Sequence, residues 1–67
     1  MRDVVQSAMQ ELSNDHREVI MLRHILDKSH AEMSELLGIP EKTVKSRLFT
    51  ARQMLGRVLK RRGVESA

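Results

Sequence analysis

Apolar residues recur along the chain at helical spacing, and they never alternate with polar residues as they would in a half-buried strand. Residues 2–12 carry an apolar stripe at positions i, i+4 and i+8, which is typical of an amphipathic helix. Residues 13–15 (Ser-Asn-Asp) interrupt this stripe, and each has a side-chain oxygen that can cap a new helix. A second helix is therefore expected over residues 15–26. Its apolar face holds Val19, Leu22 and Leu26.

A capping signal marks the start of a third helix. The Ser29 hydroxyl can accept a hydrogen bond from the backbone N–H of Glu32, while the Glu32 carboxylate reaches back to the N–H of Ser29. This helix is short, because Gly38 follows Leu37 and a glycine readily takes the left-handed conformation that ends a helix.

The fourth helix is expected from Pro40 to about residue 60, since the fixed φ and missing N–H of proline suit a first helical turn. Fraying is expected over residues 61–67. A short helix, a glycine-containing turn and a longer helix form the helix-turn-helix pattern, here over about residues 29–56. We predict an all-α fold: one four-helix domain over residues 1–67, with a homeodomain-like or winged-helix-like three-helix core.

The fourth helix has two chemically different faces when its residues are placed at about 100° each around the axis. The apolar stripe consists of Val44, Leu48, Ala51, Leu55 and Val58. The opposite face consists of Lys42, Lys45, Ser46, Phe49 and Gln53. Cations, a hydroxyl, an amide and an aromatic ring are groups that meet phosphates, base edges and thymine methyls in a major groove. Glu41 and Thr43 lie at the helix start, where backbone N–H groups can also face a phosphate.

Each of these residues has a second interpretation. Lys42 and Lys45 could be ordinary solvated lysines. Phe49 could pack beneath the N-terminal helix, contact DNA or meet a protein partner. The basic tail at residues 60–62 is more typical of a solvated segment, although it would raise nonspecific DNA affinity.

Two arginines flank the core stripe of the fourth helix. Arg47 and Arg52 could reach backbone phosphates, or they could pair with Glu32 or Glu35 of the third helix. The sequence leaves both possibilities open.

Charge is distributed unevenly along the chain. Residues 1–40 carry four Lys/Arg and seven Asp/Glu, a net charge of −3, whereas residues 41–67 carry eight Lys/Arg and two Asp/Glu, a net charge of +6. A basic half of this kind faces a polyanion, with nucleic acid as the first candidate and an anionic membrane surface as the second. No run is long and apolar enough for a transmembrane helix or a signal peptide.

The composition points to a binding module rather than an enzyme. A chain of 67 residues supports only a thin core, and the absence of cysteine excludes disulfides and thiolate zinc sites and suits a reducing, cytoplasmic compartment. His16, His24 and His30 are eight and six residues apart, which is not the i, i+4 spacing of paired metal ligands. We expect no catalytic residue, no metal, no cofactor and no small-molecule substrate.

Residues 12–59 resemble the C-terminal promoter-recognition domain (region 4) of bacterial sigma factors, and most of all the extracytoplasmic-function (ECF) group. Three segments carry the resemblance: residues 17–23 (REVIMLR), residues 32–40 (EMSELLGIP), and residues 43–48 (TVKSRL) followed by Ala51 and Arg52. The resembling stretch, residues 12–59, covers about three-quarters of the chain.

The resemblance implies that the last helix reads the promoter element at minus thirty-five. The residues that it places near bases or phosphates are Arg23, Ser29, His30, Glu41, Lys42, Thr43, Lys45, Ser46 and Phe49, and we add the flanking Arg47 and Arg52. Lys42 stands where a glycine is frequent in the family, and Thr50 where an arginine is common. These departures leave the base preference open.

The resemblance also implies partners. It predicts an upstream region 2 domain in a longer natural chain, docking on the β flap of the RNA polymerase core, and an anti-sigma factor that covers the same apolar surface. The candidates for that surface are Ile20, Met21, Ile25 and Met54, which could instead close the core against the first helix.

Two rival functions remain. A LuxR-type response-regulator DNA-binding domain shares the Arg-Glu-Val and Thr-Val-Lys segments, but it usually carries a histidine at the position of Arg47 and lacks the Leu-Gly-Ile-Pro segment. A protein-interaction module held only by an anti-sigma partner would not touch DNA.

Overall fold

The computed structural model describes the backbone of residues 2–63 and the side chains of residues 4–63. Within this range the chain is helical, which confirms the predicted all-α fold with four helices. The elements are α1 (Arg2–Met9), α2 (Asn14–Ile20), a π-helical turn η1 (Met21–Ile25), α3 (His30–Leu37) and α4 (Glu41–Arg61). The part of the predicted fraying that falls on residues 64–67 lies outside the described residues.

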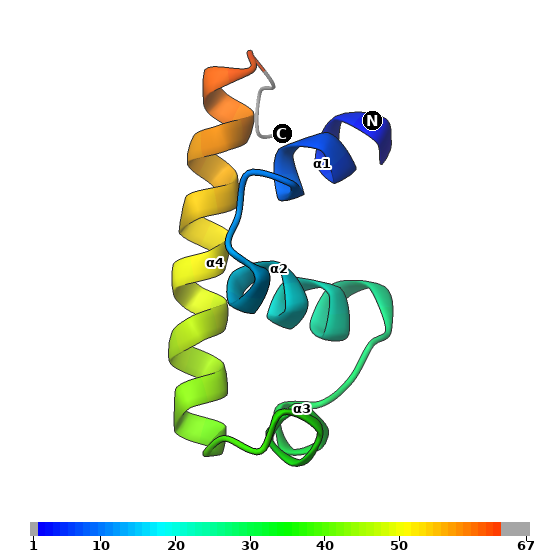
Figure 1. The fold of residues 1–67 in the computed structure, drawn as a ribbon, viewed down its shortest axis with the longest axis vertical. Coiled ribbons are helices and arrows are strands. Elements are labelled where there is room, and N and C mark those ends of the chain that lie inside the picture. Colours follow the sequence, from blue (N-terminus) through cyan, green and yellow to red (C-terminus); the bar gives the residue numbers. More distant parts are fainter. Residues whose placement is uncertain (1, 64–67) are drawn as a thin grey trace.

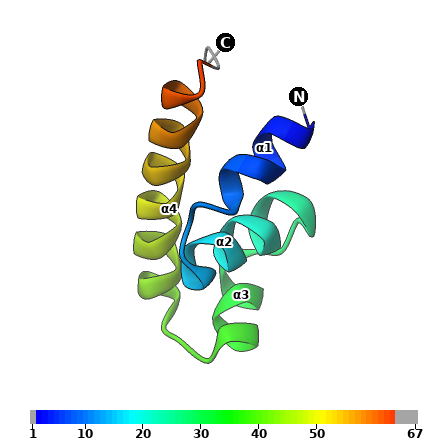
Figure 2. The ribbon, with the colours of Figure 1, turned by 45° about the horizontal axis from the view of Figure 1, so that its top comes forward.

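Helix α4 forms a long rod, and the three preceding helices lie along one side of it (Figures 1 and 2). Figure 1 shows α3 beside the beginning of α4, α2 beside its middle and α1 beside its end. This arrangement leaves the other side of α4 without a neighbouring helix. The domain measures 35 × 21 × 18 Å along its principal axes.

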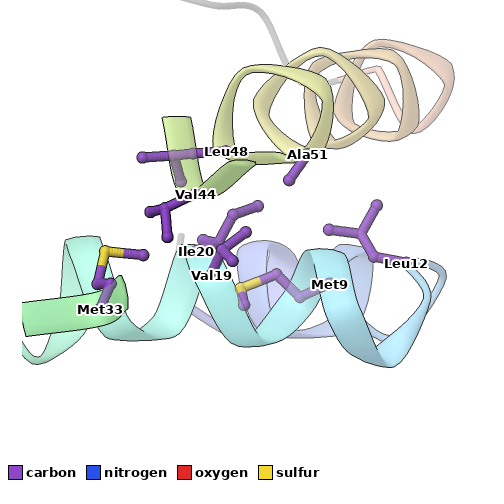
Figure 3. Close-up of a cluster of buried hydrophobic side chains, with 8 residues drawn as sticks. All are labelled: Met9, Leu12, Val19, Ile20, Met33, Val44, Leu48 and Ala51. Atoms are coloured by element: carbon purple, nitrogen blue, oxygen red, sulfur yellow. The ribbon is translucent and has the colours of Figure 1, made fainter. Parts of the chain in front are cut away.

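The core lies between α4 and the shorter helices (Figure 3). Val44, Leu48 and Ala51 of α4 point toward Val19 and Ile20 of α2, as predicted for the apolar stripe. The cluster is completed by Met9, Leu12 and Met33. Val58 is buried further along the same stripe, and Leu55 is half-buried.

Of the three candidate caps, Ser13 is the one that caps α2, since its side chain accepts from the backbone N–H of His16, and the helix begins at Asn14, one residue earlier than expected. The helix then passes into the π turn, which the sequence did not predict. Leu26 donates from its backbone N–H to the carbonyl of Met21, five residues earlier, at 3.0 Å. The wider turn changes which side chains face the core. Leu26 is 56% exposed, so its prediction as a core-facing residue is wrong, whereas Ile20 is buried.

The boundaries of α3 follow the predicted local chemistry. Both bonds of the capping box are present: the N–H of Ser29 donates to Glu32 Oε1 at 2.8 Å, and the N–H of Glu32 donates to Ser29 Oγ at 3.1 Å. Gly38 ends the helix in the left-handed region, with φ 66° and ψ 32°. Its N–H donates to the carbonyl of Ser34 at 2.9 Å, so the turn that leads into α4 is closed by a backbone bond.

The ends of α4 differ slightly from the prediction. Pro40 is the capping residue and the helix begins at Glu41, one residue later than expected. At the other end, the prediction of fraying from Arg61 is wrong for Arg61 and Arg62. Their guanidinium groups donate to the two carboxylate oxygens of Glu11 at 2.9 and 2.6 Å. Arg62 also donates to Ser7 Oγ, which ties the end of α4 to α1.

Candidate nucleic-acid interface

The side of α4 that faces away from the core is exposed to solvent. Lys42, Lys45, Ser46, Phe49 and Gln53 are all exposed, while Val44, Leu48 and Ala51 on the other side are buried. We call these five exposed residues the recognition face. Because no helix of the described chain covers this face, a partner can approach it along the N-terminal half of α4.

Phe49 is the largest apolar side chain on the recognition face. It is 62% exposed, so the interpretation in which it packs beneath the N-terminal helix is wrong. Contact with DNA and contact with a protein partner remain as its two possible uses. An exposed aromatic ring surrounded by cations and a hydroxyl is chemically suited to an apolar contact in a groove.

The first turn of α4 borders this face. Glu41 is exposed and Thr43 is half-buried. The capping residue, Pro40, has no side-chain acceptor, so the first N–H groups of the helix receive no side-chain cap. These N–H groups are donors that a phosphate oxygen could accept from.

Three further predicted residues lie at the start of α3 and in η1. Ser29 is exposed, and its hydroxyl oxygen accepts from the backbone N–H of Glu32. Hydrogen bonds from the Ser29 backbone and hydroxyl hold the pKa of the Glu32 carboxyl below its ordinary value, so this carboxylate stays charged. His30 is half-buried at the first position of α3.

Arg23 is half-buried in η1 and is held by the turn that follows it. One of its terminal nitrogens lies 3.4 Å from Asp27 Oδ1 and 3.4 Å from the carbonyl oxygen of Lys28. Asp27 has a positive φ of 55°, which is unusual for a residue other than glycine and is tolerated best by aspartate and asparagine. The guanidinium of Arg23 thus stabilises the tight connection between η1 and α3.

The two arginines that flank the core stripe behave differently. Arg47 is half-buried, and Arg52 is exposed. Among the described side chains, neither forms an ion pair with Glu32 or Glu35, so that alternative is not observed. Arg52 instead donates from Nε to the Nε2 atom of His24, at 3.1 Å.

The sequence analysis did not anticipate the contact of His24, because it considered this residue only as a possible metal ligand. Burial, followed by the positive charges of Arg52 and Arg23, holds the pKa of the His24 imidazole below its ordinary value of 6.5. The ring is therefore neutral at pH 7 and can accept the hydrogen bond. No local pattern signals this pair, since 28 residues separate its members.

The four candidates for the partner surface do not form one surface. Ile20 is only 4% exposed and belongs to the core, so its prediction as a surface residue is wrong. Met21 and Ile25 are exposed, and Met21 lines a shallow hollow along α2. Met54 lines a different and larger hollow of about 630 Å³ between α4 and Glu11, in the connection that follows α1. We call this hollow the α1–α4 groove, and it is lined by Glu11, Met54, Arg57, Val58, Lys60 and Arg61.

The described residues contain no group of three or more His, Asp or Glu side chains placed to hold a metal ion. Within the same part of the chain, no helix combines the length and the apolar character that crossing a membrane requires.

Comparison with known proteins identifies the family. A family model described as Sigma-70, region 4 matches residues 2–55. The chain is 36% identical over 64 residues to the ECF RNA polymerase sigma factor SigM of Bacillus subtilis (strain 168), covering 96% of this chain and 39% of that protein. It is 33% identical over 60 residues to the ECF RNA polymerase sigma factor SigW of the same organism, covering 90% of this chain and 32% of that protein.

These matches confirm the resemblance to region 4 of ECF sigma factors, and they favour it over the response-regulator alternative. The family is one of DNA-binding transcription factor domains and not a family of enzymes. The chain spans about two fifths or less of the length of the curated relatives that it matches. The roles of individual residues and the region 2 domain stay predictions.

Proposed function

Because the chain belongs to the sigma-70 region 4 family, we propose that it recognises promoter DNA as the region 4 domain of an ECF sigma factor. In this proposal α4 enters the major groove and reads the element at minus thirty-five. The observation that carries the proposal is the solvent-exposed recognition face of α4, which lies opposite the buried stripe of the same helix.

The dimensions of the recognition face suit a short DNA element. From Lys42 to Gln53 the helix rises about 16 Å, which corresponds to about five base pairs of duplex. An α-helix fits the major groove, where each base pair presents a distinct set of donors, acceptors and methyl groups. The face is therefore long enough to read one short promoter element.

We assign roles on the recognition face by chemistry. The Lys45 ammonium donates to a phosphate or to a guanine edge, the Ser46 hydroxyl donates to or accepts from a base edge, and the Phe49 ring contacts a thymine methyl group. Glu41 and Thr43 border the groove at the helix start, and the Glu41 carboxylate can accept from a cytosine amino group. Lys42 adds a phosphate contact beside them.

The remaining polar and basic residues position the domain on the duplex. Arg23, Ser29 and His30 approach the DNA backbone from the α3 side, and Arg47 and Arg52 approach it from the flanks of α4. The net charge of +6 on residues 41–67 supports this orientation, since it places most of the positive charge on the helix that faces the polyanion.

We also propose that the α1–α4 groove docks the β flap of RNA polymerase and that an anti-sigma factor competes for it. Its half-buried Met54 offers an apolar side chain that a partner helix can cover, beside the buried Val58, and the rim carries Arg57, Lys60 and Arg61. The adaptable side chain of methionine suits a surface that accepts more than one partner. Met54→Glu should abolish capture of the chain by RNA polymerase core while leaving DNA binding unchanged. Equal capture of the wild type and Met54→Glu would contradict the proposal that the α1–α4 groove docks the β flap.

Selection from a randomised pool of duplexes tests the promoter-binding proposal. The wild-type chain should enrich one short motif, and Phe49→Ala should change the preference at one position of that motif. Ile25→Ala is the matched control, because Ile25 is 61% exposed, almost the same as Phe49, but lies in η1. The control should enrich the wild-type motif.

Failure of the wild-type chain to enrich any motif would contradict sequence-specific recognition and favour a module that binds only proteins. Enrichment of paired half-sites one helical turn apart would instead favour the response-regulator alternative, because such domains bind as dimers.

A further inference from the structure

The contact between His24 and Arg52 joins the turn η1 to the middle of α4. His24 Nε2 accepts from Arg52 Nε at 3.1 Å, and both side chains lie at the surface. Within the described residues, the two terminal nitrogens of Arg52 make no hydrogen bond, so four N–H groups remain available to a ligand. His24 therefore fixes the Nε atom of Arg52 and leaves the two terminal nitrogens of the guanidinium free.

Arg52 borders the recognition face. It follows Lys45 by seven residues, which places it within about 20° of Lys45 around the helix axis and about 10 Å further along it. A cation at this position lies next to the backbone of a duplex whose groove receives Lys45 and Phe49. The free terminal nitrogens of a guanidinium can donate to two phosphate oxygens at once. A mobile arginine loses side-chain entropy when it binds in this way, and an arginine that is already held loses less.

We propose that His24 is a positioning residue, which accepts the Nε–H of Arg52 and directs the free end of the guanidinium at a DNA backbone phosphate. This inference rests on the proposed function, because it needs α4 to lie against DNA. His24 itself touches no DNA in this arrangement.

The role requires a neutral imidazole. When the ring is protonated, both nitrogens become donors, so the hydrogen bond from Arg52 is lost and two cations stand side by side. The low pKa of His24, caused by burial and by the charges of Arg52 and Arg23, keeps the ring neutral at pH 7. Acidification below this pKa should release Arg52.

The charged groups on the neighbouring elements do not counteract the two arginine charges that keep His24 neutral at pH 7. Arg23 pairs with Asp27, Arg17 bonds to Gln10 and Asn14, and Glu32 closes the capping box with Ser29. The other ionisable residues of α2 and α3 are Asp15, His16, Glu18, His30 and Glu35. None of the described carboxylates offsets the two arginine charges that act on His24.

The sign of the pH effect separates two uses of His24. A protonated histidine that touched a phosphate would strengthen DNA binding as the pH falls. A neutral histidine that positions Arg52 predicts the opposite, since the contribution of Arg52 weakens on acidification. His16 and His30 are present in every variant compared, so the informative quantity is the affinity ratio between variants that differ only at His24 or Arg52.

The test measures the loss of affinity caused by Arg52→Ala in three backgrounds: His24, His24→Gln and His24→Ala. Fluorescence anisotropy of the 67-residue chain is recorded with one labelled duplex that the wild type selects from a random pool, at about pH 8 and at the lowest pH at which every variant stays folded. Thermal unfolding followed by circular dichroism confirms that each variant is folded.

At about pH 8, Arg52→Ala should weaken binding roughly three- to tenfold when His24 is present, the range expected for one positioned hydrogen-bonding group. The loss should persist with His24→Gln, because a glutamine oxygen can accept from the same Nε–H, and it should shrink with His24→Ala. At the low pH the loss should shrink with His24, as the ring becomes protonated, but not with His24→Gln, which does not titrate.

An Arg52→Ala loss that is equal in all three backgrounds and at both pH values would overturn the positioning role while leaving DNA binding intact. A wild-type affinity that rises on acidification, with the rise abolished by His24→Gln, would assign His24 to direct phosphate contact instead. Failure of the wild-type chain to bind any duplex would overturn the proposed function, and this inference with it.

Discussion

Two exposed glycines of the same chain should respond in opposite directions to the same substitution. Gly38 ends α3 with φ 66°, whereas Gly56 lies inside α4. A β-carbon added at either position meets no atom within 4 Å, so neither substitution introduces a clash. The backbone conformation alone then decides the change in the free energy of unfolding.

The magnitudes follow from that conformation. Holding a residue with a β-carbon in the left-handed region costs about 1–2 kcal/mol. Alanine has less conformational freedom than glycine in the unfolded chain, and this difference offsets about 0.4–1 kcal/mol of that cost. Gly38→Ala should therefore destabilise the domain by about 1 kcal/mol. Gly56→Ala should stabilise it by about 0.5–1 kcal/mol, because alanine is the better residue inside a helix.

Thermal and urea unfolding of the two variants and the wild type measure these changes. In a domain of this size, 1 kcal/mol moves the melting temperature by about 4–8 °C, so the two variants should melt on either side of the wild type. Gly38→Asn is a control that should lie closer to the wild type, since asparagine tolerates the left-handed region. A Gly38→Ala variant as stable as the wild type would show that the α3–α4 turn does not hold Gly38 at positive φ.

Three further outcomes can be checked with the same set of assays. Leu48→Ala removes a fully buried side chain of α4 and should lower the free energy of unfolding by about 2–5 kcal/mol. That is a large part of the roughly 3–10 kcal/mol expected for such a domain. A loss below about 1 kcal/mol would contradict the place of Leu48 in the core. Phe49→Ala should leave the urea midpoint nearly unchanged, and a large loss would mean that the ring is packed. Hydrogen bonds and charges from Arg62 and Arg61 hold the pKa of Glu11 below its ordinary value of 4.5, so this carboxylate contributes stability above that value and loses it as the pH falls through the lowered pKa. Glu11→Gln should therefore reduce the acid sensitivity of the melting temperature, and an unchanged pH profile would exclude the tie between α1 and α4.

Local chemistry in the sequence is enough to predict the boundaries of α3 and the buried side of α4. The Ser29–Glu32 capping box and the glycine stop at Gly38 each depend on residues a few positions apart, and both appear as expected. The apolar stripe of α4 is long enough for helical periodicity to identify it, and Val44, Leu48 and Ala51 are buried.

The π turn could not be predicted in the same way. Its i to i+5 hydrogen bonds use residues that would form an ordinary α-helix equally well by propensity, so packing against the other helices decides between the two. The wider turn lies directly before Leu26, which helical periodicity placed on the apolar face and which is 56% exposed in the structure.

In the candidate site, too, some features could be predicted from the sequence and others could not. The exposure of the recognition face follows from the burial of the opposite stripe and was predictable. The ties from Arg62 to Glu11 and from Arg52 to His24 join residues 51 and 28 positions apart, and no sequence spacing signals them. Only the fold brings these side chains together.

The salt dependence of DNA binding by two single-charge variants tests the central claim most directly. Lys45→Ala removes an exposed cation from the recognition face, and Arg57→Ala removes an exposed cation of the same helix that lines the α1–α4 groove. Each phosphate neutralised by the protein contributes about 0.9 to the slope of log affinity against log salt concentration. We expect Lys45→Ala to reduce the slope by about one and Arg57→Ala to leave it unchanged. Equal slopes for wild type and Lys45→Ala, or a reduction confined to Arg57→Ala, would show that DNA does not lie against this side of α4.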